Sequence, residues 1–355
     1  MLHNKWGEVG EILVKTLLSL LSLFFVAILI FFIWLIRPID DFDSALLIPK
    51  ESNVSIFLRL NLKDQGIKAV LTKVEERYVK KSVEAWIISF LLPSRVSGGI
   101  IYNADNPRKP DYTVIADMGW RVRLLNLVRI ASFYPGVEKF AADYSTYNGY
   151  RLMTAEAKKN PIKGFTVVSG KIVGSNNMEF LKKALNTLHE QNAFFLKQPP
   201  IRPLYDAMSG YDGLILINNT NGWLTRIVRN AEDKNDYSIF PSVDTVAAIA
   251  IGMDIVDENR VEGEIVLSQH HSSESEVVIE DMRFFAGFFR RILRTYDIDM
   301  QGDVTIQDSA VRFFFKGEGF RALWEKILKG GFSHEKISFN RTGHYLLAHT
   351  FCVCG

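Results

Sequence analysis

The sequence predicts an α+β protein with one N-terminal transmembrane helix and a body of mixed antiparallel strands and helices outside the cytoplasm. Three observations lead to this fold class. Hydrophobic residues make up 48% of the 355-residue chain, which is enough to bury a large core. One uncharged run near the N-terminus is 21 residues long. The remaining chain alternates short strand patterns with amphipathic helix patterns.

The composition excludes several classes of protein. The chain has 42 Lys and Arg residues against 40 Asp and Glu residues, which gives a formal net charge of +2. This balance argues against a dedicated nucleic-acid-binding protein, because such proteins have a strongly basic face. Two cysteines exclude a disulfide scaffold and a four-cysteine zinc site. At about 150 residues per domain, the length predicts two or three structural units.

The uncharged run covers Thr16–Ile36 and is predicted to be a signal anchor. As a helix it would be roughly 31 Å long, and a bilayer core is about 30 Å thick. Trp34 lies near one end, as in the aromatic belt of membrane helices. A cleaved signal peptide is the alternative, but its apolar region would have about 7–15 residues and end at small residues. The longer run and the Arg-Pro-Ile-Asp that follows favour an uncleaved anchor.

The charges that flank the anchor predict its orientation and the domain layout. Lys5 and Lys15 precede the anchor, and Arg37 and Lys50 follow it, so the positive-inside rule slightly favours a cytoplasmic N-terminus. We therefore expect a cytoplasmic tail at 1–15, the anchor at 16–36 and a linker at 37–50. The body, with a first α+β region at 51–240 and a second at 241–355, would be extracytoplasmic, and periplasmic if the protein is bacterial.

The first region alternates predicted strands with predicted helices. Its predicted strands are 54–62, 100–103, 112–116, 150–156, 165–169, 171–173 and 213–217. Its predicted helices are 67–90, 121–130, 176–190 and 223–228. The clearest helix is 176–190, where Asn176 is expected to be the N-cap and apolar residues recur every three or four positions.

The second region shows a similar order of elements. Its predicted strands are 246–256, 260–268, 303–307, 310–316, 336–340 and 344–352. Its predicted helices are 278–295 and 320–328. Because both regions show a strand-then-helix order, two similar subdomains are one interpretation of the body.

A stretch from Gly149 to about Asn230 resembles an uncharacterised group of bacterial single-pass, extracytoplasmic proteins known only as a domain of unknown function. It contains GFTVVSGKIVGSNNMEFLKKALNTL, a strand-turn-helix unit, and then LYDAMSGYDGLILINNTNGW. The resemblance covers about a quarter of the chain and rests on the order of elements. It implies a membrane-tethered location and gives no catalytic residues.

One loop is a candidate calcium site. Asp297–Asp308 reads DIDMQGDVTIQD, with carboxylates at positions one, three and twelve of an EF-hand loop and Gly302 at position six. The ligands would include Asp297, Asp299, Gln301 and Asp308. Gln301 and the short Asp308 depart from the usual pattern, and a strand pattern follows where a helix is required. A connection from a helix to a hairpin is therefore the alternative.

One helix is a candidate membrane-surface element. Between Met282 and Leu293, aromatic and aliphatic residues fall on one half of the helix and arginines on the other. Such a helix suits an anionic membrane surface. The alternative is a helix that packs on a sheet with its arginines in solvent. The candidate residues are Phe284, Phe285, Phe288, Phe289, Arg290, Arg291 and Arg294.

No motif of nucleophilic, metalloprotease or dinucleotide-binding chemistry is present in the sequence, so an enzyme is not favoured. The sequence predicts no cofactor and no nucleic-acid partner. It predicts a membrane-anchored binding or scaffold protein, an accessory subunit of an envelope assembly with a protein partner. The alternatives are a protein that binds lipid or another hydrophobic ligand at the membrane surface, and an envelope hydrolase.

Overall fold

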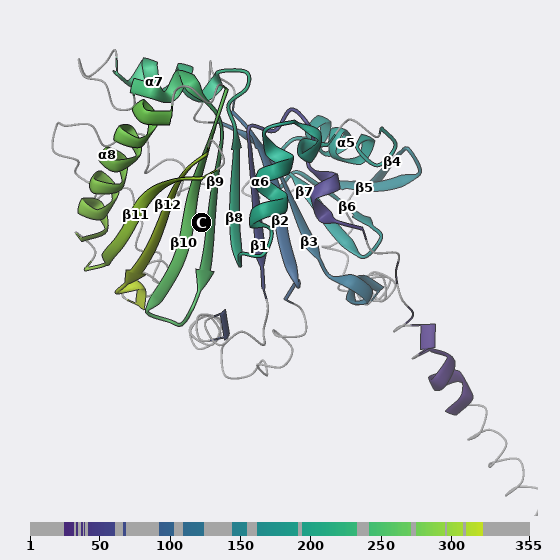
Figure 1. The fold of residues 1–355 in the computed structure, drawn as a ribbon. Coiled ribbons are helices and arrows are strands. Elements are labelled where there is room, and N and C mark those ends of the chain that lie inside the picture. Colours follow the sequence, from purple (N-terminus) through teal and green to yellow (C-terminus); the bar gives the residue numbers. More distant parts are fainter. Residues whose placement is uncertain are drawn as a thin grey trace, which may run out of the picture.

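A single antiparallel sheet is the framework of the protein in the computed structural model (Figure 1). The structure describes residues 25–31, 33–34, 37, 39, 42–60, 67–68, 92–102, 109–123, 144–154, 162–190, 194–232, 241–270, 275–294, 297–307 and 310–321. In these residues 12 strands pair in the order β11-β12-β10-β9-β8-β1-β2-β3-β7-β6-β5-β4.

The bounds of these elements agree in large part with the predicted strands. The strands are β1 Val54–Arg59, β2 Arg95–Ile101, β3 Asp111–Asp117, β4 Tyr144–Tyr147, β5 Tyr150–Thr154, β6 Gly164–Val168, β7 Lys171–Ser175, β8 Gly213–Asn218, β9 Val246–Ile255, β10 Arg260–Gln269, β11 Asp299–Gln307 and β12 Ala310–Glu318. The α-helices are α5 Met178–Asn186, α6 Ile201–Met208, α7 Trp223–Glu232 and α8 Ser275–Arg294. Short 3₁₀ helices are η1 Ser44–Leu47, η2 Gly119–Arg121, η4 Phe195–Lys197 and η5 Pro241–Thr245.

The predicted fold class, an α+β body behind a transmembrane helix, is wrong. The described chain is mainly one broad antiparallel sheet with short helices. Within the described residues, no helix combines the length and the apolar character needed to cross a bilayer. Much of the predicted helix content, at 69–90, 124–130 and 322–328, lies outside the described residues, as do the strands predicted at 336–340 and 344–352.

The two predicted regions do not form separate subdomains, because the sheet is continuous between them. In the middle of the sheet β8 pairs with β1 on one side and with β9 on the other. On each side of the β1–β8 pair the same pattern follows, with β2, β3, β7 and β6 on one side matching β9, β10, β12 and β11 on the other. The central pair is antiparallel, so the two halves repeat one topology about an approximate two-fold axis. Among the described strands, the hairpin β4–β5 extends the first half only.

The first core cluster lies on one face of the sheet, under α5, α6, η1 and η4. Helix α5 packs on β3, β6 and β7 through the apolar stripe that includes Leu181 and Leu185. Its N-cap is Asn177, whose side chain accepts a hydrogen bond from the Glu179 N–H, so the prediction of Asn176 was one residue early. Asn176 instead joins the loop before β3 to α5, because its side chain bonds Tyr112 N and Pro110 O.

The second core cluster lies on the opposite face of the sheet, under α8. Along β10, Val266 belongs to the first cluster, whereas its neighbours Ile265 and Leu267 belong to the second. Successive side chains of a strand point to opposite faces, so both faces of this strand are covered by apolar groups. Helix α8 packs on β11 and β12 through Val278 and Met282, among others.

Helix α6 and strand β4 were missed by the sequence analysis. No element was predicted at 201–208, where Pro199 and Pro200 precede the helix and Pro203 lies within it. Proline is tolerated there because the first N–H groups of a helix have no acceptor within it. Ile201 and Leu204 then bury the start of α6 against the sheet.

Candidate functional site

An exposed apolar helical segment lies at the N-terminal end of the described chain. We define the apolar segment as described residues 25–31, 33 and 34, which are all helical and all hydrophobic. Phe25, Leu29 and Ile30 are each at least 60% exposed, and Ile33 is 56% exposed. At 100° per residue these side chains project around more than one side of the helix. Figure 1 shows the segment extending away from the sheet.

Arg123 connects the end of the apolar segment to the sheet. Its Nη1 donates hydrogen bonds to the carbonyl oxygens of Trp34, at 2.5 Å, and Arg37, at 2.7 Å. The guanidinium carbon also lies 5.7 Å from the centre of the Trp34 ring, a cation–π contact. Strand β3 leads into η2, and Arg123 comes two residues after η2 ends. The apolar segment therefore meets the body at the end of the sheet where β2 begins and β3 ends.

A small hollow opens on the α6 face near the same end of the central strands. Tyr205 of α6 lies over the ring of Phe57 and donates a hydrogen bond of 2.8 Å to the Asp43 carboxylate. Burial, with a smaller effect from Asp43, raises the pKa of Tyr205. Ser97 and Arg95 also line the hollow, and the Ser97 hydroxyl is buried without a hydrogen-bond partner in the described residues. This mixed lining suits water or a small polar group better than an acyl chain.

A buried charged cluster lies on β10 and β12. Arg312 Nη1 lies 2.6 Å from Glu264 Oε1, and the Glu264 side chain is 6% exposed. The Tyr211 hydroxyl donates a 3.3 Å hydrogen bond to the other carboxylate oxygen. The ring of Tyr211 covers Gly252, where an added Cβ would lie 2.4 Å from the ring. Glu264 therefore has a donor on each oxygen, which is what a buried carboxylate requires.

The cluster predicts a measurable titration. Burial and the neighbouring Glu264 carboxylate raise the pKa of Tyr211 to about 12. The folded state thus holds the phenol proton more tightly than the unfolded state, and the stability that this contributes is lost as the pH rises from about 10 towards 12. We expect one ring-carbon NMR resonance to titrate near pH 12 and to disappear in Tyr211→Phe. A Tyr211 resonance that titrates at the value of free tyrosine would contradict this.

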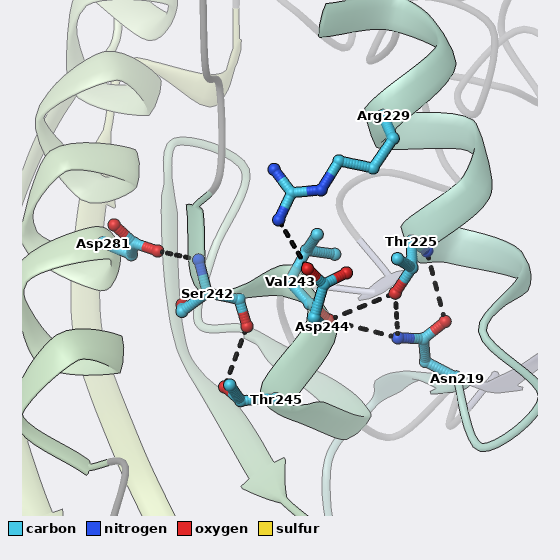
Figure 2. Close-up of polar contacts among 8 residues, drawn as sticks. All are labelled: Asn219, Thr225, Arg229, Ser242, Val243, Asp244, Thr245 and Asp281. Carbon is cyan, nitrogen blue, oxygen red and sulfur yellow. Dashed lines mark hydrogen bonds and ion pairs between the residues drawn. The ribbon is translucent and has the colours of Figure 1, made fainter.

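A second polar cluster joins β8, α7, η5 and α8 (Figure 2). The Asn219 amide nitrogen donates to the carbonyls of Val246, at 2.9 Å, and Val243, at 3.3 Å. Its amide oxygen accepts from the N–H of Leu224, at 3.0 Å. Asn219 is 2% exposed, and its side chain thus fixes the start of α7 to the turn before β9.

Two further contacts complete this junction. Arg229 of α7 lies 2.7 Å from the Asp244 carboxylate. The Ser242 N–H donates a 2.6 Å hydrogen bond to Asp281 of α8 (Figure 2). These groups bond to one another, so the arrangement positions helices against the sheet.

The predicted membrane-surface helix is α8, and the structure gives some of its residues other roles. Arg290 donates a hydrogen bond to the Gly302 carbonyl and lies 5.7 Å from the centre of the Phe313 ring, so it contacts the sheet. Arg294 lies 3.5 Å from Asp299, and Arg291 is exposed. The side chains of Phe284, Phe285, Phe288 and Phe289 lie outside what the structure describes. Surface binding by α8 stays a prediction.

The candidate calcium ligands are spread along a strand. Asp297 precedes β11, and Asp299 and Gln301 lie within it, whereas Asp308 lies outside the described residues. A strand rises about 3.3 Å per residue, which separates its two ends instead of closing a loop around an ion. Among the described residues, no group of three or more His, Cys, Asp or Glu side chains could hold a metal ion. The calcium site stays a prediction.

Arg123 and the Glu264–Arg312 pair were not predicted from the sequence. Glu264 directly precedes the apolar run 265–267 of β10, which is a signal for a charge that is buried and needs a partner. Its partner lies on another strand, and only the register of β10 with β12 brings the two together. Arg123 has no comparable signal, because its contacts are to backbone carbonyls 86 and 89 residues away.

The comparisons with known proteins show little similarity. No protein-family model matches the chain, and no curated protein is similar to it. Among solved structures, crystal form I of TP0453 aligns with 81% of this chain and 98% of its own, at 11% identity and a TM-score of 0.40.

Proposed function

We propose that the protein is a binding protein held at a lipid surface by the apolar segment, with its sheet body outside the cytoplasm. The observation that supports this is the exposure of Phe25, Leu29, Ile30 and Ile33 on a helix that extends away from the sheet (Figure 1). Burying each such side chain is favourable by about 1.5–3 kcal/mol. A helix that is apolar on several sides suits lipid better than a partner protein, which would cover one stripe.

The sheet body would then be the binding part, acting as a scaffold or accessory subunit of an envelope assembly. The contact of Arg123 with the end of the apolar segment would hold this sheet close to the lipid. A carrier of lipid or another hydrophobic ligand is less well supported, because the hollow on the α6 face has a mixed polar lining.

Flotation with phosphatidylcholine vesicles tests the lipid attachment. We expect the full chain to float with the vesicles. A variant with Phe25→Asn, Leu29→Asn, Ile30→Asn and Ile33→Asn should bind at least about 100-fold more weakly, because four side chains lose their transfer free energy. The matched control replaces four apolar residues of the body that are each at least 40% exposed: Leu58→Asn, Val256→Asn, Val277→Asn and Ile306→Asn.

The control variant should float like the unmodified protein. Two results would contradict the proposal: flotation of the segment variant at the normal level, or equal losses in the two variants. Circular dichroism of both variants establishes whether the sheet is intact, and a second segment variant with Leu29→Ser and Ile33→Ser covers the case in which the first does not fold.

A further inference from the structure

We infer that the arginines at the end of the sheet next to the apolar segment bind the phosphate groups of anionic lipids. This inference rests on the proposed function and adds a lipid class to it. The arginines come from separate parts of the chain. Arg37 follows the apolar segment, Arg59 ends β1, Arg95 begins β2, and Arg121 and Arg123 lie at and just after η2.

The pairing of the strands brings these arginines to one end of the sheet. In β2, Arg95 is the register partner of Arg59 in β1 and of Asp117 in β3. Arg121 Nη1 donates a 2.6 Å hydrogen bond to the carbonyl of Leu92, three residues before Arg95. Arg123 in turn reaches the carbonyls at the end of the apolar segment. Arg59, Arg95 and Arg121 therefore lie at the same end of the sheet, and Arg37 and Arg123 adjoin the apolar segment itself.

Within the described residues, the guanidinium groups of Arg37, Arg59 and Arg95 have no carboxylate partner. Arg59 donates to the carbonyls of Ser209 and Gly210, which are neutral acceptors. Within the described residues, Arg37 and Arg95 have no ion-pair partner, and both are exposed. A guanidinium group with free N–H donors suits the oxygens of a phosphate.

Two of the described carboxylates near this end of the sheet, those of Asp117 and Asp43, have partners of their own. Asp117 lies 3.6 Å from the buried ammonium group of Lys171 and also accepts a hydrogen bond from Gly119 N–H. Asp43, which lines the hollow with Arg95, accepts hydrogen bonds from Tyr205 and from Ala45 N–H. These carboxylates reduce the local positive potential without pairing with Arg37 or Arg95.

The position of the arginines favours lipid phosphates over free phosphate. If the apolar segment enters lipid, Trp34 lies at the level of the headgroups, where aromatic rings are enriched. Arg37 and Arg123, which adjoin Trp34, then lie at the depth of the lipid phosphates. Each arginine near an anionic membrane surface strengthens binding by about 5-fold.

Vesicle composition separates this inference from the proposed function. Binding of the full chain is measured on vesicles of phosphatidylcholine alone and on vesicles that also contain phosphatidylglycerol. We expect the anionic lipid to strengthen binding of the unmodified protein. The variant Arg37→Gln with Arg95→Gln should lose roughly 25-fold on the anionic vesicles and bind phosphatidylcholine normally.

The matched control is Arg226→Gln with Arg151→Gln, which removes two exposed arginines from α7 and β5. It should stay close to the unmodified protein on both kinds of vesicle. Equal losses in the two variants, or no gain from phosphatidylglycerol, would overturn the inference. The inference would also be overturned if inorganic phosphate released the protein from the anionic vesicles at concentrations too low for general salt screening. That result would mean that the arginines bind a free anion. Failure on phosphatidylcholine alone would instead count against the proposed function.

Discussion

Replacing Arg312 with alanine is expected to lower the free energy of unfolding by about 3–5 kcal/mol, because it leaves the Glu264 carboxylate buried without its ion-pair partner. The Glu264 side chain is 6% exposed and lies 2.6 Å from Arg312. Tyr211 still donates a hydrogen bond to one oxygen, but a single neutral donor does not replace a guanidinium group. Urea unfolding followed by circular dichroism measures the change.

Two controls make this result specific. Lys316 lies on the same strand, 2.9 Å from Glu262, but its side chain is 74% exposed. Lys316→Ala should therefore cost less than about 1 kcal/mol, as exposed ion pairs do. The double variant Glu264→Gln with Arg312→Met removes both charges and should recover much of the loss. Equal losses for Arg312→Ala and Lys316→Ala would show that the buried pair does not hold β10 to β12.

Asn219→Asp is expected to lower the free energy of unfolding by about 3 kcal/mol or more at neutral pH. The change keeps the shape of the side chain but replaces its NH₂ group, which donates to the carbonyl oxygens of Val243 and Val246, with a carboxylate oxygen (Figure 2). That oxygen cannot donate and would face two other oxygens. The cost combines two lost hydrogen bonds with the burial of a charge that has no cation beside it.

The pH dependence of this variant gives a second measure. The carbonyl oxygens and the burial favour the protonated form, so the pKa of the new carboxyl group is raised in the folded state. The loss of stability relative to the unmodified protein is present above that raised pKa and diminishes as the pH falls towards about 3.9, the unfolded value. The control is Asn221→Asp, since the exposed Asn221 side chain uses its oxygen to accept from Trp223 N–H. A loss of stability that does not change with pH, or an equal loss of stability in Asn221→Asp, would contradict this account of Asn219.

Local alternation of apolar and polar residues was enough to predict individual strands. β3, β8, β9 and β10 were predicted within two residues of their bounds. The start of β2 was missed because Gly98 and Gly99 interrupt the pattern, since glycine is unfavourable in strands. At Gly99 an added Cβ would lie 2.6 Å from Ser52 Oγ, so close packing explains the glycine.

The assembly of these strands into one sheet could not be predicted from local patterns. It depends on the pairing of β1 with β8, whose residues are about 160 positions apart in the chain. Val54 and Ile217, for example, are register partners, and nothing in either strand alone identifies the other. The same limit applies to the contact of Arg123 with Trp34, because the two residues are 89 positions apart in the chain.

The most direct test of lipid attachment is site-specific photo-crosslinking in membranes. A benzophenone side chain is introduced at Leu29 in the apolar segment, or at Ile306 on β11, where the native side chain is 51% exposed. We predict adducts with lipid acyl chains from position 29 and none from position 306. Adducts with protein alone from position 29, or equal lipid adducts from both positions, would contradict the claim that the apolar segment holds the protein at a lipid surface.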